Sequence, residues 1–116
     1  MAIRNLTQRN AMATAYGVAA PHGALFTGDP GAGDAATNEV TGAAYARQNM
    51  NWGAAAASAI TGAPVFGVNA GVTVTYAGVA VSDVKTTADV MDSAAITSQA
   101  FASDGTFTVT FTYTQS

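Results

Sequence analysis

The last stretch of the chain, residues 104–114, alternates strictly between two kinds of side chain. Its sequence, DGTFTVTFTYT, places phenylalanine, valine or tyrosine at the odd positions from 107 to 113 and threonine at the even positions. Because successive side chains leave a β-strand on opposite faces, this pattern predicts a strand with one face in the core. The threonine face carries no charge. A threonine face can be an ordinary solvent-exposed strand face. It can also contact an identical face of another subunit, because it carries no charge that would repel it. Both interpretations stay open.

Other short alternating segments recur at a spacing of about ten residues, which is typical of a sandwich or barrel. The candidate strands are residues 25–27, 45–52, 64–68, 72–81 and 93–101. Two turn signals, at 69–71 and at 104–105, predict hairpins that join 64–68 to 72–81 and 93–101 to the last strand. Gly78 interrupts one strand and is a candidate bulge. We therefore expect an all-β fold, a single β-sandwich of jelly-roll type.

A helical pattern is confined to residues 6–17. Thr7 is the expected N-cap, Met12 and Tyr16 lie four residues apart on one face, and Gly17 is the expected end. A helix this short is marginal alone and must lie against something. The expected organisation is an N-terminal arm with a short helix over residues 1–20 and a β-sandwich domain over residues 21–116.

The single tryptophan is the expected anchor of the core, because a large aromatic side chain buries the most apolar area. The predicted core is Trp52, Phe66, Val72, Val74, Phe107, Val109 and Phe111.

Charged residues are scarce, at 9% of the chain against roughly 25% in an average soluble domain. The formal net charge is −3, which argues against a nucleic-acid partner, because phosphates require clustered lysine and arginine. No charge lies between Arg47 and Asp83, but glycine and proline interrupt this stretch too often for a membrane-spanning helix. The absence of cysteine and of a secretory segment favours folding in a reducing cytoplasm.

No residue pattern points to catalysis, a cofactor or a metal ion. The GDPGAGD segment, residues 28–34, has no nearby lysine and so lacks the ending of a phosphate-binding loop. Asp29, Asp34 and Glu39 are spaced too widely for a calcium loop. His22 is the only histidine, so it cannot complete a zinc site with cysteine or a second imidazole. We expect a non-enzymatic protein without cofactors.

The segment ALFTGDPGAGDAATNEVTGAAYARQNMNW resembles the small virion proteins of tailed phages of actinobacteria, which are often labelled tail fibre or minor tail proteins. The shared elements are a short strand (25–27), Asp-Pro-Gly (29–31), Asn-Glu-Val (38–40), Tyr-Ala-Arg (45–47) and a strand ending in Trp52. The resemblance continues through the valine-rich segment and the closing strand, so that it covers residues 6–116. After Gly78 the family often has Trp-Asp-Ala, whereas this chain has VAVSDVK. The resemblance therefore implies no shared role for the loop at 82–92.

The resemblance implies a β-sandwich subunit on the outside of a phage particle, made in the host cytoplasm and attached to the capsid or tail. Its partners would be other virion proteins, with neither nucleic acid nor a membrane involved. Capsid decoration and a minor tail or fibre role both stay open, and the lack of a fibre repeat or coiled-coil heptad in the chain is the argument for decoration. A homo-oligomer is expected, with a trimer favoured because such proteins usually sit on symmetry axes. The alternative is a carbohydrate- or host-surface-binding module.

Two surfaces are candidates for the partner interface. The N-terminal helix carries two of the four basic residues and could steer onto an acidic partner, although it could equally pack on its own sandwich. The threonine face is the second surface. The expected interface residues are Arg4, Arg9, Met12, Tyr16, Thr108, Thr110 and Thr112.

Overall fold

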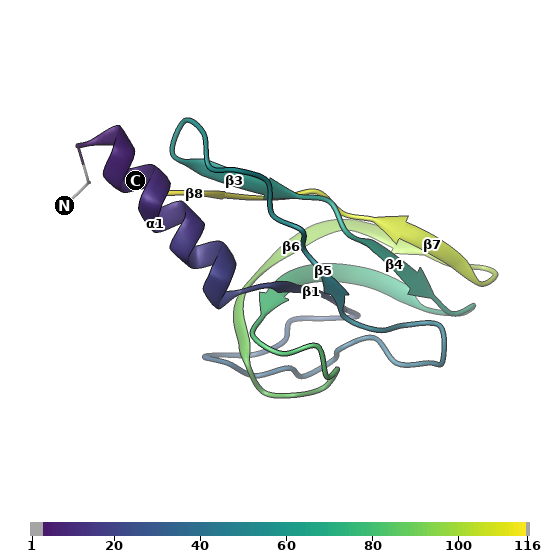
Figure 1. Ribbon diagram of the computed structural model, residues 1–116. Coiled ribbons are helices and arrows are strands. Elements are labelled where there is room, and N and C mark those ends of the chain that lie inside the picture. Colours follow the sequence, from purple (N-terminus) through teal and green to yellow (C-terminus); the bar gives the residue numbers. More distant parts are fainter. Residues whose placement is uncertain (1–3, 116) are drawn as a thin grey trace.

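Eight β-strands follow one helix in residues 4–115, which are the residues that the computed structural model describes (Figure 1). The helix is α1 (Leu6–Ala19), and the first four strands are β1 (His22–Phe26), β2 (Gln48–Asn49), β3 (Ala59–Gly62) and β4 (Val65–Val68). The last four strands are β5 (Thr73–Ala80), β6 (Val90–Ala100), β7 (Gly105–Thr108) and β8 (Phe111–Thr114). The expectation of an all-β sandwich with a short N-terminal helix is confirmed.

One layer of the sandwich is a four-stranded antiparallel sheet in the order β2-β1-β5-β6. Its strand β1 is buried on both faces. Leu25 packs with the main core cluster on one side, and Ala24 and Phe26 pack with Ala80 and Val90 on the other. This explains the continuous apolar run in β1, because a strand covered on both faces loses the polar half of the alternation.

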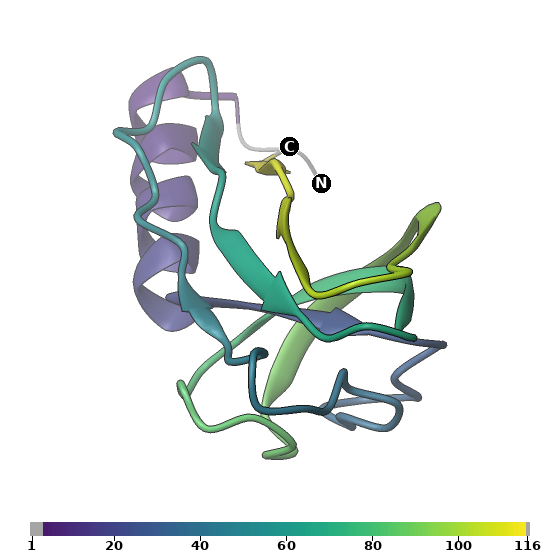
Figure 2. The same ribbon diagram turned by 90° about the vertical axis from the view of Figure 1, so that its right-hand side faces the viewer.

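The other layer is a long two-stranded β-ribbon formed by residues 59–68 and 105–114. Strand β3 pairs with β8 and β4 pairs with β7, and one register runs through both pairs: Gly62 faces Phe111 and Val65 faces Thr108. The break between them falls at Pro64, which has no backbone N–H to donate, although its carbonyl accepts from the Val109 N–H at 3.3 Å. Figures 1 and 2 show this β-ribbon lying across the sheet.

The alternation of the last strand is confirmed in the β-ribbon. Thr106, Thr108, Thr110, Thr112 and Thr114 are exposed, and the odd-numbered residues between them are half-buried. The partner segment 59–68 alternates in the same way, with its even-numbered residues buried. The interruption at Pro64 thus leaves the facing of every side chain unchanged.

Both predicted hairpins are wrong. Strand β4 pairs with β7 instead of β5, and β6 pairs with β5 instead of β7. Each turn carries the chain from one layer to the other, and the Asp104 carboxylate accepts a hydrogen bond of 2.7 Å from the Ala70 N–H, which ties the two turns together. Turn residues permit a reversal, but they do not select which strand the next segment will pair with, and long-range pairing prevailed here.

The predicted ends of the helix are also wrong. Asn5 is the N-cap, since its side chain accepts from the Gln8 N–H, and the helix continues past Gly17 to Ala19. Gly17 is buried where α1 crosses the body: a Cβ there would lie 3.0 Å from both Ile60 Cδ1 and Trp52 Cδ1. This glycine allows close packing instead of ending the helix.

The predicted core is only partly correct. Phe66 and Val74 are fully buried, whereas the other five members, Trp52, Val72, Phe107, Val109 and Phe111, are half-buried. A two-stranded ribbon is too narrow to cover its own inner face at the rims. The core is formed mainly by side chains that were not predicted. The largest of these are Leu25, Phe26, Val40, Tyr45, Met50 and Val68.

The strand expected over residues 45–52 is limited to Gln48–Asn49. The side of the chain that is buried changes along this segment, from the odd-numbered to the even-numbered residues. Tyr45 and Arg47 are buried on one side of this change and Met50 on the other. The candidate bulge is displaced as well, because the ladder between β5 and β6 shifts at Val74/Tyr76 and at Val79/Ala80, on either side of Gly78.

Candidate functional site

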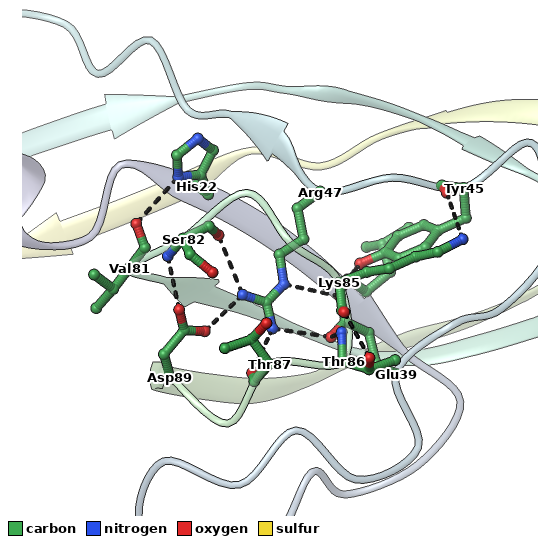
Figure 3. Close-up of polar contacts among 11 residues, drawn as sticks. His22, Glu39, Tyr45, Arg47, Val81, Ser82, Lys85, Thr86, Thr87 and Asp89 are labelled. Atoms are coloured by element: carbon green, nitrogen blue, oxygen red, sulfur yellow. Dashed lines mark hydrogen bonds and ion pairs between the residues drawn. The ribbon is translucent and has the colours of Figure 1, made fainter.

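A buried ion-pair network lies between the loop before β2 and the loop before β6 (Figure 3). Arg47 Nη2 lies 3.0 Å from Glu39 Oε1, and Arg47 Nη1 lies 2.6 Å from Asp89 Oδ1. The side chains of Glu39 and Arg47 are 0% exposed and that of Asp89 is 18% exposed. Charges so deeply buried require complete pairing, which this arrangement provides.

All five N–H donors of the guanidinium group are used. Nε and Nη2 form a bidentate pair with Glu39, Nη1 also donates to the Ser82 carbonyl, and Nη2 also donates to the Thr87 carbonyl at 2.8 Å. Asp89 takes the remaining donor and also accepts from the Ser82 N–H at 2.8 Å. The arginine therefore holds the 82–89 loop through its backbone as well as through a charge.

Glu39 is the second hub of the network. Its carboxylate accepts from the Tyr45 hydroxyl at 2.7 Å and from the Thr86 N–H at 2.7 Å. The same tyrosine oxygen accepts from the Leu25 N–H in β1, and Lys85 Nζ donates to the Tyr45 carbonyl. The network therefore joins the sheet to both loops.

The pKa values follow from these contacts. Burial raises the pKa of the Tyr45 hydroxyl, and its hydrogen bond to Glu39 raises it further. Burial by itself would lower the pKa of Arg47, but the hydrogen bonds and charges of Glu39 and Asp89 outweigh burial and raise it. Burial would raise the pKa of Asp89, yet the hydrogen bonds from Arg47 and Ser82 prevail and lower it. The ionised forms of Arg47 and Asp89 are thus favoured.

This network stabilises the structure, because its charged side chains are largely buried and are paired with one another. It contains Glu39 of the Asn-Glu-Val motif and both Tyr45 and Arg47 of the Tyr-Ala-Arg motif, so these motifs serve loop anchoring. Sequence reasoning noticed the motifs and missed the pairing with Asp89. The available signal was that a chain so poor in charge still places a glutamate and an arginine eight residues apart.

A second candidate is an aromatic cavity of about 140 Å³ between the carboxyl-terminal half of α1, the β5–β6 edge of the sheet and β8. Its main lining residues are Tyr16, Trp52, Phe111, Tyr113, Asp92 and Ser93.

The aromatic side chains of this cavity form one cluster. Tyr16 stacks on Tyr113 with ring centroids 3.7 Å apart and planes 5° apart, and Trp52 meets Tyr16 edge-on at 6.4 Å. The indole Nε1 donates to the Ala20 carbonyl at 2.9 Å, which fixes the ring. Burial, together with the negative charge of the Asp92 carboxylate, raises the pKa of Tyr16 to about 12, so its hydroxyl stays protonated.

The residues predicted for a partner interface do not lie together. Tyr16 lines the aromatic cavity, whereas Thr108, Thr110 and Thr112 are exposed on the outer face of the β-ribbon. Arg4 and Met12 are exposed at the helix, with Met12 48% exposed. Arg9 is partly buried, and its Nε donates to Ser58 Oγ at 2.7 Å. Thr112 also borders the aromatic cavity, so the predicted residues divide into a helix surface, a β-ribbon surface and two residues, Tyr16 and Thr112, that line the cavity.

The structure adds little to the other candidate sites. Within residues 4–115, no three histidine, cysteine, aspartate or glutamate side chains lie close enough together to hold a metal ion. In the GDPGAGD loop, the Asp29 carboxylate accepts from the Gly31 N–H at 2.8 Å, an ordinary turn contact. The helix in the described part of the chain is too short to cross a membrane.

Comparison with known proteins agrees with a phage structural protein. No curated protein and no solved structure matches the chain. The sequence profile of one family, described as podophage GP4 fiber I protein gp80, matches residues 1–115. This confirms the phage-fibre part of the resemblance noted in the sequence, while actinobacterial hosts and a minor tail role stay predictions. The chain belongs to the podophage GP4 fiber I protein gp80 family, a family of phage fibre proteins.

Proposed function

We propose that the chain is a non-enzymatic structural subunit of a phage virion, exposed on the particle and attached to its capsid or tail in several copies. The observation that carries this proposal is the family match over residues 1–115. The fold adds support, since the chain's most densely bonded polar cluster is an internal anchor for two loops. A small, rigid body with anchored loops suits a subunit that must hold its shape in an assembly.

The outer face of the β-ribbon is the surface that we propose for contacts with identical or neighbouring subunits. It is exposed and uncharged along its whole length. Its members are Thr61, Val65, Thr106, Thr108, Thr110 and Thr112. Val65 is 51% exposed beside its partner Thr108, and the hydroxyls of Thr61 and Thr112 lie 3.3 Å apart. Such a face can meet a copy of itself without burying any charge.

We further propose a homo-oligomer with a trimer favoured, because closed symmetry allows one such face to be used by every copy. The exposed surface of α1, with Met12 and the preceding Arg4, is the second contact that we propose, directed at a different virion protein. Arg9 contributes to it less, since this arginine already bonds Ser58.

Sedimentation of the isolated chain tests the β-ribbon contact. Thr110→Lys places a charge in the middle of the outer face, while Thr97→Lys places the same charge on an exposed position of β6. We expect the wild type and Thr97→Lys to sediment as the same oligomer and Thr110→Lys to shift toward monomer. An unchanged oligomer in Thr110→Lys, with normal incorporation into particles, would reject the β-ribbon contact.

A second candidate function, a carbohydrate- or host-surface-binding module, is favoured by one observation, the aromatic cavity beside Asp92. Screening the chain against immobilised glycans distinguishes the two candidates. Saturable binding to a defined glycan favours the module, and its absence leaves the structural role alone.

A further inference from the structure

We infer that the aromatic cavity binds one ring of a neutral saccharide, with Trp52 and the Tyr16–Tyr113 pair as its apolar wall and Asp92 as its hydrogen-bond acceptor. This inference rests on the second candidate function and specifies its site and ligand class. It is independent of how the subunit attaches to the particle.

The first argument is the accessibility of the tryptophan. Trp52 is the single tryptophan of the chain and would be expected in the core, yet it is half-buried. Its indole lines the aromatic cavity and also a second hollow of about 340 Å³ bounded by Gly17, Val18 and Ile60. Large aromatic surface that is fixed in position but not enclosed is the usual wall of a small-ligand site.

The second argument is the combination of apolar and polar groups in a space of limited size. A sugar ring presents apolar C–H groups on its faces and hydroxyls around its edge, so it needs both kinds of wall. Phe111 and Tyr113 supply further aromatic surface, while Asp92 and Ser93 come from β6 on the opposite side. A volume of about 140 Å³ lies below the roughly 300–1,000 Å³ of typical small-molecule pockets, so the cavity holds at most one ring and not an extended chain.

The third argument is that the Asp92 carboxylate has hydrogen-bond acceptor positions left for a ligand. Asp92 Oδ1 accepts a hydrogen bond of 2.9 Å from the Ser93 N–H, and the carboxylate also neighbours the Tyr16 hydroxyl. A carboxylate has about four acceptor positions, so further positions remain for the hydroxyl donors of a sugar. Hydrogen bonds to a charged acceptor are about twice as strong as neutral ones, which suits recognition by few contacts.

The charge of the lining selects the ligand class. Asp92 supplies the one carboxylate among the lining residues, which include no lysine, arginine or histidine. An acidic sugar would bring a second negative charge beside Asp92, an exposed carboxylate that no basic side chain of the lining offsets, and like charges repel. A neutral sugar keeps its hydroxyls as donors without that repulsion. The cavity should therefore reject uronic acids.

The competing explanation is that the aromatic cluster only fastens α1 to the body. Both explanations predict that removing Tyr16 or Trp52 harms the fold, so those deletions do not separate them. Asp92→Asn does separate them, because the amide retains the size of the side chain and loses the charge and one acceptor oxygen. Asp83→Asn, a carboxylate of the loop before β6 and outside the cavity, is the matched control.

The test is titration of the full chain with glucose, galactose, mannose, N-acetylglucosamine and glucuronic acid, followed by the intrinsic fluorescence of Trp52. Because there is no other tryptophan, the signal reports the surroundings of Trp52, which lines both hollows. Asp92 lines the aromatic cavity alone, so the Asp92→Asn variant assigns the signal to that cavity. We expect saturation by at least one neutral sugar with a dissociation constant on the order of 1 mM for a single ring, and none by glucuronic acid. Asp92→Asn should weaken binding about tenfold and Asp83→Asn should leave it unchanged.

Two outcomes would overturn the inference. One is the absence of saturation with every neutral sugar and also with polysaccharide extracted from the host surface. The other is saturation that Asp92→Asn leaves unchanged while circular dichroism shows the variant folded. Saturation by the polysaccharide but by no free sugar would assign the site to a glycan terminus. Incorporation of Asp92→Asn into particles is a separate readout. Normal incorporation with lost binding supports both proposals, and failed incorporation of the folded variant would contradict a saccharide site that is independent of attachment.

Discussion

Replacing Arg47 by methionine should lower the free energy of unfolding by about 3–4 kcal/mol, since removing one partner of a buried ion pair typically costs about 3–5 kcal/mol. The methionine fills the volume of the arginine stem but leaves the Glu39 carboxylate, which is 0% exposed, without its counter-ion. Hydrogen bonds from the Tyr45 hydroxyl and the Thr86 N–H to that carboxylate survive, so the lower part of the range applies.

Urea unfolding followed by the fluorescence of Trp52 measures this loss. Arg4→Met is the control, because Arg4 is exposed and an exposed substitution changes stability by less than about 0.5 kcal/mol. Adding Glu39→Gln to Arg47→Met removes the unpaired buried charge and should restore at least about 1 kcal/mol.

Two results would refute this reasoning. A loss below about 1 kcal/mol for Arg47→Met would mean that water reaches the carboxylate and that the network is not buried in solution. A double variant no more stable than Arg47→Met would mean that the lost backbone hydrogen bonds of the 82–89 loop, and not the stranded charge, carry the effect.

Three further predictions concern other parts of the molecule. Asp89 has a lowered pKa, so its stabilising contribution is complete above its ordinary pKa of 3.8 and disappears as the pH falls through its lower folded value; acid unfolding of Asp89→Asn should be less steep in that range. Gly62→Ala should cost about 1–3 kcal/mol in thermal unfolding, because its Cβ would lie 2.6 Å from the Met50 carbonyl oxygen, while Gly53→Ala, with 3.6 Å of room, should be nearly neutral. Trp52→Ala should cost about 2–3 kcal/mol, less than the roughly 3–5 kcal/mol of a fully buried tryptophan, and a cost below about 1 kcal/mol in denaturant unfolding would contradict its fixed position in the aromatic cluster.

The sequence by itself determined the fold class, the presence of the helix and the facing of the last strand. These are local properties. The alternation from Phe107 to Tyr113 follows from the two-residue repeat of a strand, so it held even though the strand is interrupted opposite Pro64. The scarcity of charged residues likewise predicted an uncharged surface, and the exposed threonines of the β-ribbon agree with this.

Only the tertiary structure decided which strands pair and which residues form the two candidate sites. Strand β4 could pair with β5 or with β7, and the turn between β4 and β5 permits either; the choice follows from the long register that β3 and β4 share with β7 and β8. Trp52 lines a cavity instead of anchoring the core, because the two-stranded β-ribbon is too narrow to cover this side chain completely. Glu39 and Asp89 lie fifty residues apart in the chain and both bind the guanidinium group of Arg47. Only the folded structure brings these groups together, and their pairing offsets the desolvation penalty of burying the charges.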